Sequence, residues 1–284
     1  EGKFDHVLVA KMENGKGVEE KDIMPNEPYD CPQKPFGGDE DYVWNPDGKH
    51  ILYVAKKKFG KEYAVSTNTD LYSYNIETGK TENLTPGRKG YDINPAYSKN
   101  GTLAWLSMRR DGYESDKQDL VAFTGLGVVN LTGHRDDIHV EGFRWADDGK
   151  RIFFWAPMNG TLQLFEVEYT GATAKLPDIF NGNGQQLTHV NDATFSSVGM
   201  CKTERRWVTT TDGKQMLVWV IYPPDFDPNK KYPTLLYCQG GPQVPLTQFY
   251  SFRWNFQLMA SNGYIVVAPN RRGMPGHGTK WNEQ

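Results

Sequence analysis

The sequence has few cysteines, and their placement excludes the usual roles of paired cysteines. Cys31, Cys201 and Cys238 are far apart and have no paired spacing, so they indicate neither a disulfide framework nor a zinc site. Cys238 lies in a predicted buried strand, where we expect it to be a small core residue. No other metal-ligand spacing is present, and we expect no metal and no cofactor.

The chain also lacks the features that favour a membrane or a nucleic acid as partner. No apolar run approaches the ~20 residues that a membrane-spanning helix needs. A formal net charge of −3 over 284 residues gives no reason to expect DNA, RNA or an anionic lipid surface. No signal peptide is visible in the first residues. With 38% hydrophobic and 24% charged residues, the composition fits a soluble globular protein of about two domains.

What the sequence does contain, up to about residue 190, is an internal repeat with a period of about 50 residues. In each copy an aromatic residue precedes a polar turn that ends in glycine, and an apolar, β-rich run follows. The three copies begin at Trp44, Tyr97 and Trp145. Asp-Gly or Asn-Gly in this setting predicts a hairpin turn, because glycine adopts positive φ without steric cost. A second anchor ends a predicted strand at Leu84-Thr85, Leu131-Thr132 and Leu187-Thr188.

Two anchors in step, with four short strands per period, predict blades of a β-propeller. The alternative is a β-sandwich with coincidental hairpins, which has no reason to keep two separate registers. Residues 1–199 are therefore predicted to form the C-terminal part of a propeller, about three blades plus a partial one. Blades bury both faces only in a closed ring, so we expect N-terminal blades elsewhere in the same protein.

After residue 199 the pattern becomes that of a parallel sheet. The segment YPTLLYCQGGPQ, from Tyr232, is an apolar run that ends in a Gly-Gly-Pro turn; a helical segment and a second apolar run, YIVVAPN, follow. This order is typical of parallel strands joined by a crossover helix. Residues 200–284 are predicted to be the N-terminal portion of an incomplete α/β-hydrolase domain. The predicted fold is thus all-β propeller blades followed by the start of a truncated α/β-hydrolase domain.

Together these residues resemble the prolyl oligopeptidase family of serine peptidases, in its dipeptidyl peptidase 5 and acylaminoacyl-peptidase branch. The resemblance is carried by the W-x-P-D-G-K turns and by DGKQMLVWVIYPP, YPTLLYCQGGPQ and YIVVAPNRRGMPGHGTKW. It implies a Ser-Asp-His triad in the hydrolase domain and a propeller that restricts access to it. It also implies hydrolysis of short peptides through an acyl-enzyme, with release of dipeptides from a free N-terminus. Bacterial relatives imply a periplasmic or secreted location.

The nucleophile of that triad is not among these 284 residues. No serine has the Gly-x-Ser-x-Gly surroundings of a nucleophile elbow, and the family order is Ser, then Asp, then His. The resemblance therefore implies that all three lie beyond Gln284 and that this chain alone is inactive. We expect as partners a peptide substrate, the remaining C-terminal hydrolase segment and the N-terminal blades of the same protein. A homodimer is also considered.

Five candidate site residues lie near the predicted strand ends of the hydrolase portion. Gln239, Gly240 and Gly241 are candidate oxyanion-hole donors, through the Gln239 amide or the backbone N–H groups. The alternative for them is a plain strand-ending turn. Arg271 and Arg272 directly follow the second predicted strand, where ligands of parallel sheets usually bind. For these two we favour a structural ion pair across the domain interface over contact with a substrate.

Acidic residues of the repeat region are candidates for holding the amino group of a substrate. They are Asp39, Glu40 and Asp41, which open a predicted blade, and Glu141. Solvated loop acids are the favoured alternative. Two other functions stay open for the protein: an acylaminoacyl peptidase or oligopeptidase, which would remove a blocked residue, and a non-catalytic propeller binding module. The residue preferred before the scissile bond is not predicted.

Overall fold

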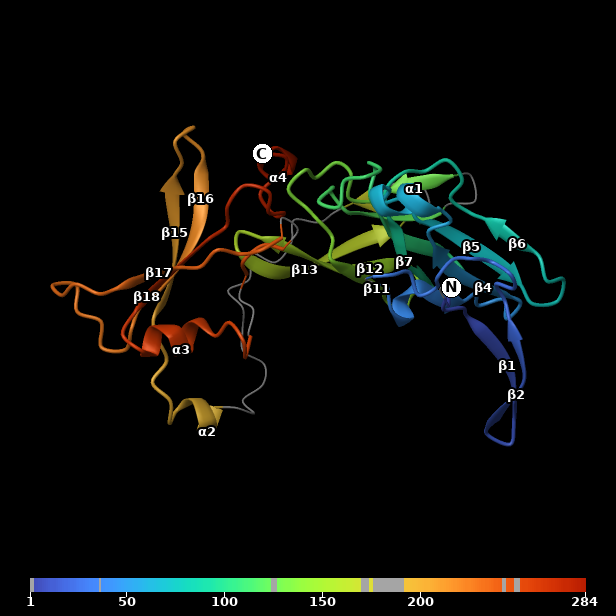
Figure 1. Ribbon diagram of the computed structural model, residues 1–284, viewed down its shortest axis with the longest axis horizontal. Helices are drawn as coiled ribbons and strands as arrows, with labels where there is room; N and C mark the ends of the chain where they lie inside the picture. The colour runs from blue at the N-terminus through green and yellow to red at the C-terminus, as the bar shows by residue number, and fades with distance from the viewer. Residues whose placement is uncertain are drawn as a thin grey trace. The chain divides into compact units, whose positions relative to one another are not determined.

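The computed structural model describes residues 3–35, 37–123, 127–169, 174–175, 192–241, 244–247 and 251–284. The chain divides into two compact units. The first consists of residues 1–156 and 164–179, and the second of residues 157–163 and 180–284. The secondary structure of both is mainly β-sheet (Figure 1). No helix within the described ranges is long and apolar enough to cross a membrane.

Residues 42–175 contain three four-stranded sheets, each with its strands in chain order. The first has β3 (Tyr42–Trp44), β4 (His50–Ala55), β5 (Asp70–Asn75) and β6 (Thr81–Asn83). The second has β7 (Asp92–Tyr97), β8 (Leu103–Ser107), β9 (Asp119–Phe123) and β10 (Val128–Asn130). The third has β11 (Gly142–Trp145), β12 (Arg151–Met158), β13 (Thr161–Tyr169) and β14 (Ala174–Lys175). Before them lie the hairpin β1 (Leu8–Glu13) and β2 (Lys16–Asp22) and the 3-10 turn η1 (Asp39–Asp41); α1 (Gly60–Val65) connects β4 and β5.

The three repeated turns of the sequence join the first and second strands of these sheets. Gly48, Gly101 and Gly149 have φ values of 68°, 81° and 67°, which confirms the predicted hairpin turns. The aspartate before the glycine, Asp47 or Asp148, accepts hydrogen bonds from the two backbone N–H groups that follow the glycine. The Asp-Gly turns are therefore stabilised by local hydrogen bonds of the aspartate as well as by the positive φ that glycine allows.

The Leu-Thr anchor has a structural role in the first two sheets. Thr132 is fully buried after β10; its hydroxyl accepts from the Leu120 N–H and donates to Asp119 Oδ1, both at 3.0 Å. Thr85 makes the equivalent two contacts at the start of β5. The hydroxyl thus ties the chain after the fourth strand to the beginning of the third. Leu187-Thr188 lies outside the described residues.

An apolar cluster joins the first sheet to the second. It is formed by side chains of β4, β5, β8 and β9: Leu52, Val54, Leu71, Leu103, Trp105 and Val121. The ring nitrogen Nε1 of Trp105 donates to the buried carboxylate of Asp92 at 2.7 Å. The indole can therefore be buried without an unpaired N–H group.

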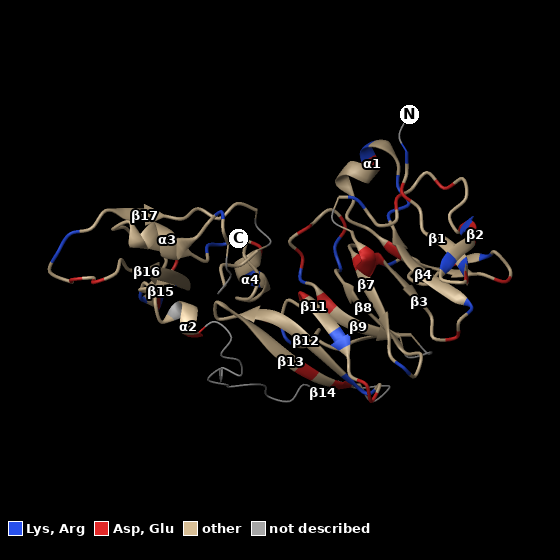
Figure 2. Ribbon diagram, turned by 90° about the horizontal axis from the view of Figure 1, so that it is seen from below, with Lys and Arg blue, Asp and Glu red and all other residues tan. Residues whose placement is uncertain are grey.

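A sheet of the second unit has the strand order β15-β16-β18-β17. Its strands are β15 (Thr203–Thr209), β16 (Gln215–Ile221), β17 (Thr234–Leu236) and β18 (Ile265–Pro269), with helices α2 (Asp192–Phe195), α3 (Phe256–Ser261) and α4 (Thr279–Asn282) around them in the chain. β17 and β18 pair in parallel, and α3 lies between them in sequence, which confirms the predicted crossover. The loop that leads into β17 carries side chains of both charge signs (Figure 2).

The expectation that Cys238 is buried in a strand is wrong. β17 ends at Leu236, and Cys238 is exposed. β17 is the last strand of its sheet, and Leu235 and Leu236 are 38% and 64% exposed. The apolar run that predicted a buried strand is thus an edge strand that the described residues leave uncovered.

We expect Thr132→Val to destabilise the protein by ~1–3 kcal/mol, because the Leu120 N–H and the Asp119 carboxylate would each lose a buried hydrogen-bond partner. Urea denaturation followed by tryptophan fluorescence measures the change. Thr78→Val is the matched control, since Thr78 is exposed in a turn and its hydroxyl accepts one long bond of 3.4 Å. Equal effects of the two substitutions would contradict the role assigned to the Leu-Thr anchor.

Candidate active site

The turn after β17 and the loop after β18 meet at one edge of the sheet. Because the two strands are parallel, with Leu236 opposite Val267, their carboxyl ends lie side by side. Gln239, Gly240 and Gly241 follow β17. Gly241 has a φ of 67°, and a side chain at Gly240 would meet no atom within 4 Å. The three predicted oxyanion-hole residues therefore form an open turn at this edge.

Arg271 lies against this turn. Its Nη2 donates to the carbonyl oxygen of Gln239 at 3.0 Å and to that of Gly241 at 3.4 Å. Its Nη1 donates to the carbonyl oxygen of Arg272 at 2.9 Å. The structure thus brings together three of the predicted residues, Arg271, Gln239 and Gly241, which are about 30 positions apart in the chain.

Arg272 has a different environment from its neighbour. It forms an ion pair with Asp212, in the turn between β15 and β16, and its guanidinium lies 4.0 Å from the centre of the Trp281 ring. All three residues belong to the second unit. Arg272 therefore makes an ion pair, as the favoured alternative predicted, but within one unit rather than across a domain interface.

The loop that carries both arginines is anchored on each side. Asn270 is fully buried and exchanges two hydrogen bonds with the backbone of Leu246, at 2.8 and 3.1 Å. The Trp281 ring nitrogen donates to the carbonyl oxygen of Arg271 at 3.0 Å. These contacts fix the backbone from which the Arg271 side chain extends.

Glu40 and Asp41 line a small cavity of about 170 Å³ in the first unit. Asp41 is 2% exposed, and its carboxylate accepts from the Gln33 N–H at 2.7 Å. Burial raises the pKa of Asp41 to about 6. Glu40 is exposed at the cavity. Glu141 is also exposed and does not line this cavity.

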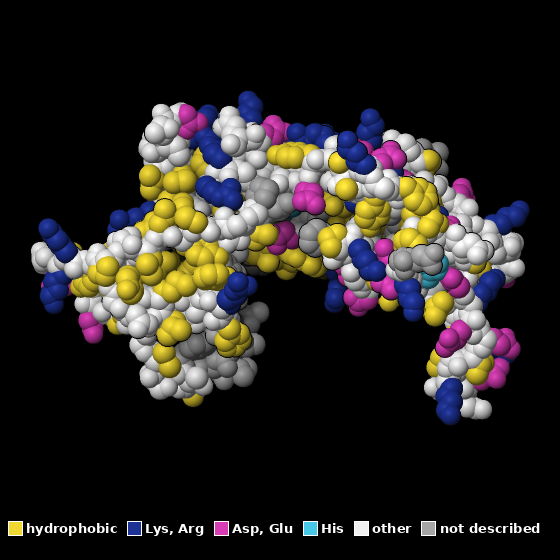
Figure 3. Space-filling view, in the orientation of Figure 1, with side chains coloured by type: hydrophobic (Ala, Val, Ile, Leu, Met, Phe, Trp, Pro, Cys, Tyr) yellow, Lys and Arg dark blue, Asp and Glu magenta, His cyan; other side chains and the backbone are white. Residues whose placement is uncertain are grey.

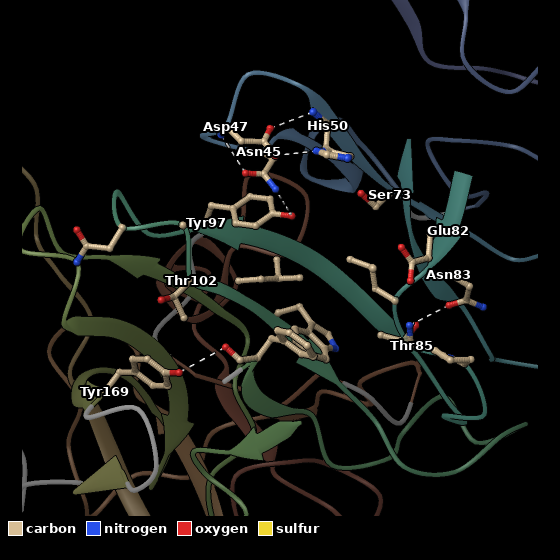
Figure 4. A pocket seen from close by; sticks show the side chains of 17 residues that line it. Asn45, Asp47, His50, Ser73, Glu82, Asn83, Thr85, Tyr97, Thr102 and Tyr169 are labelled. Carbon is tan, nitrogen blue, oxygen red and sulfur yellow. Dashed lines mark hydrogen bonds and ion pairs between the residues drawn. The ribbon is translucent and has the colours of Figure 1, made fainter. Parts of the chain in front are cut away.

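A larger cavity of about 680 Å³ lies in the first unit, lined by side chains of the first two sheets and by Tyr169 (Figure 4). His50 Nδ1 lies 2.6 Å from Asp47 Oδ2, and the Asn45 amide donates to the Tyr97 hydroxyl at 3.4 Å. None of the predicted site residues lines it. The volume is in the range of small-molecule sites. Two of the repeated turns contribute to its lining, the first with Asn45 and Asp47 and the second with Asn100 and Gly101.

Comparison with known proteins gives consistent matches. Residues 250–284 match the profile of the "Prolyl oligopeptidase family". Dipeptidyl-peptidase 5 of Porphyromonas gingivalis is 43% identical, over 98% of this chain and 46% of its own length. The protein of the same name from Porphyromonas endodontalis is 40% identical, over 98% and 45%. A crystal structure of the acylaminoacyl peptidase of Pyrococcus horikoshii superposes with a TM-score of 0.71 and 17% identity, covering 97% of this chain and 44% of that one.

These matches confirm the resemblance that the sequence predicted. The chain is related to the prolyl oligopeptidase family of serine peptidases. Two sequence relatives within that class, each matching 98% of this chain, are dipeptidyl-peptidases 5. The chain spans about half the length of the curated relatives it matches.

We expect Asp41→Asn to stabilise the protein more at neutral than at acid pH. Burial raises the pKa of Asp41 from 3.8 to about 6, so the unfolded chain loses this proton at a lower pH than the folded one. The carboxylate therefore costs stability increasingly from about pH 4 to pH 6, and fully above that. Asparagine cannot ionise and still accepts from Gln33, so its advantage should be ~1–3 kcal/mol larger above about pH 7 than at about pH 4.

Urea denaturation at the two pH values measures this difference. Asp39→Asn is the control, because Asp39 is exposed in the same 3-10 turn. The pH dependence of the effect of Asp41→Asn should exceed that of this control. An equal pH dependence for the two substitutions would show that the Asp41 carboxylate is not destabilised by burial.

Proposed function

We propose that this chain is part of a serine exopeptidase that releases dipeptides from the free N-terminus of short peptides. The observation that carries the proposal is the open Gln239–Gly241 turn, which lies at the carboxyl edge of a parallel strand pair and contacts Arg271. The printed names of the relatives support the substrate class. An acylaminoacyl peptidase or oligopeptidase is the alternative with the same chemistry, and a non-catalytic binding module is the alternative of another class.

The three four-stranded sheets are proposed to be blades of a propeller that, with a partial blade before them, occupies residues 1–199. Each copy of the sequence repeat begins at the first strand of one sheet, and the apolar cluster between the first two sheets is the packing that neighbouring blades need. Residues 200–284 are proposed to be the N-terminal portion of an α/β-hydrolase domain. The other blades of the propeller and the other strands of the hydrolase domain are proposed to come from the rest of the same protein.

The proposed mechanism is acyl transfer through a serine ester. The serine oxygen attacks the scissile carbonyl, and histidine takes the hydroxyl proton and passes it to the leaving amine as the C–N bond breaks. Water then hydrolyses the ester and releases the dipeptide. Serine, aspartate and histidine are proposed to lie outside residues 1–284. This chain is proposed to contribute the donors to the developing oxyanion. They are the backbone N–H groups of Gly240 and Gly241, or the side-chain amide of Gln239.

We further propose that the remaining hydrolase segment covers the exposed edge of β17. Apolar side chains gather on the surface around β17 and α3 (Figure 3). Exposed large hydrophobic residues in this region are Leu235, Leu236, Val244, Phe252, Trp254 and Leu258. An edge strand with such side chains is a template for pairing with a further strand. A homodimer and a periplasmic or secreted location stay predictions.

Glu40 is proposed to hold the substrate amino group in the first unit, with Glu141 as the other candidate. Glu40 is exposed at a cavity whose lining also includes the buried carboxyl group of Asp41. A carboxylate at the mouth of a cavity can accept charge-assisted hydrogen bonds from an ammonium group. Arg272 is not proposed to bind substrate, because Asp212 and Trp281 already occupy its guanidinium.

The proposal is tested by cleavage of two chromogenic substrates, a dipeptide derivative with a free amine and its N-acetylated form. The samples are this chain, this chain mixed with the segment expected after Gln284, and the full-length protein. We expect activity in the last two samples, on the free amine only. Cleavage of the blocked substrate would move the protein to the acylaminoacyl group, and activity of the chain alone would contradict the placement of the triad. No activity in any sample would favour the binding module.

In the full-length protein, Gln239→Ala is expected to lower kcat about tenfold or more, in line with the ~10²–10³ that a lost oxyanion-hole donor costs. The substitution should change kcat rather than KM, because the hydrogen bond to the oxyanion forms in the transition state. Gln215→Ala, on an exposed position of β16, is the control and should leave both constants unchanged. An unchanged kcat in Gln239→Ala would leave the backbone N–H groups as the only donors from this turn.

A further inference from the structure

Arg271 bridges the two carbonyl groups that enclose the glycine N–H groups of the candidate oxyanion hole. Its Nη2 donates to the carbonyl oxygens of Gln239, at 3.0 Å, and Gly241, at 3.4 Å. We propose that Arg271 is a positioning residue, whose guanidinium holds this turn in one conformation before the substrate binds. The inference rests on the proposed function of the turn as an oxyanion hole.

The turn needs such a restraint because its own residues supply little. Gly240 and Gly241 have no side chains to pack, and glycine has the widest range of backbone conformations. Gly240 is exposed, and the space where a side chain would lie is empty. Neither N–H group donates a hydrogen bond to another of the described residues. An oxyanion hole acts through donors that are fixed in advance, so a freely moving turn would stabilise the transition state less.

A guanidinium at this place can fix the donors through the geometry of the peptide bond. The C=O and N–H groups of a trans peptide point in opposite directions. When the Gln239 carbonyl is held against Arg271, the Gly240 N–H must therefore point away from the guanidinium. The second contact, at Gly241, restricts rotation on the other side of the Gly240–Gly241 peptide. Both glycine N–H groups lie between the two restrained carbonyls.

An arginine suits this role better than a lysine. The planar fork has five N–H donors in fixed directions, and here it contacts three carbonyl oxygens, those of Gln239, Gly241 and Arg272. The backbone carbonyl of Arg271 is held by a hydrogen bond from the Trp281 ring nitrogen. Arg271 has no ion pair with a carboxylate among the described residues, whereas Arg272 pairs with Asp212. The uncompensated positive charge beside the turn also favours negative charge that develops there.

The test uses Arg271→Ala and Arg271→Lys in the full-length protein, with Arg144→Ala as the control because Arg144 is exposed on β11. On the free-amine substrate we expect Arg271→Ala to lower kcat about 10- to 100-fold with KM changed less than about threefold. Arg271→Lys should recover only part of this loss. Millimolar guanidinium should restore part of the kcat of Arg271→Ala, since the site is exposed, and should not affect the control.

Limited proteolysis within residues 237–241, with the products identified by mass spectrometry, is the measurement that does not depend on activity. Cleavage there should be faster in Arg271→Ala than in the wild type or in Arg144→Ala, because a more mobile turn fits a protease more readily. Unchanged cleavage or an unchanged kcat would overturn the inference, as would a loss of kcat that follows thermal stability and is not restored by guanidinium. If the wild-type protein cleaves neither substrate, the proposed function fails, and the proteolysis result still decides whether Arg271 orders the turn.

Discussion

The parallel pairing of β17 with β18 is the constraint on which the candidate site depends. It brings the Gln239–Gly241 turn and the Arg271 loop to the same edge, although the helix α3 and about 30 residues separate them in the chain. An antiparallel pair would place the two loops at opposite edges. The contact between Arg271 and the turn is therefore a consequence of topology first and of side-chain chemistry second.

The local features of the fold could be predicted because their causes are local. A glycine with positive φ is present in all three hairpin turns, and in two of them an aspartate accepts from the following N–H groups. Both features are visible in the sequence. The order of strand, glycine turn, helix and strand likewise predicted the parallel pair. The Leu-Thr repeat was visible too, but its structural role could not be predicted. The Thr132 hydroxyl makes its hydrogen bonds with Asp119 and Leu120, which lie on a strand earlier in the chain.

The details of the site could not be predicted for the opposite reason. Arg271 and Arg272 are adjacent and chemically identical, yet one contacts main-chain carbonyls and the other an aspartate and a tryptophan. Which partner each finds depends on how distant loops approach the end of β18. The exposure of Cys238 is a similar case: an apolar run predicts a buried strand, but the exposed side chains of β17 depend on what covers the edge of the sheet.

This difference between the two arginines bears on how the site works. Arg272, tied to Asp212 and stacked on Trp281, holds the loop to the β15–β16 turn and has its charge largely balanced. That anchoring leaves Arg271 free to direct its charge at the Gln239–Gly241 turn. Arg272 thus has a structural role through its ion pair, and Arg271 has the proposed positioning role at the turn. One arginine could not make both sets of contacts. In our proposal, the glycine turn gains order without side chains of its own and so stays open to the proposed substrate.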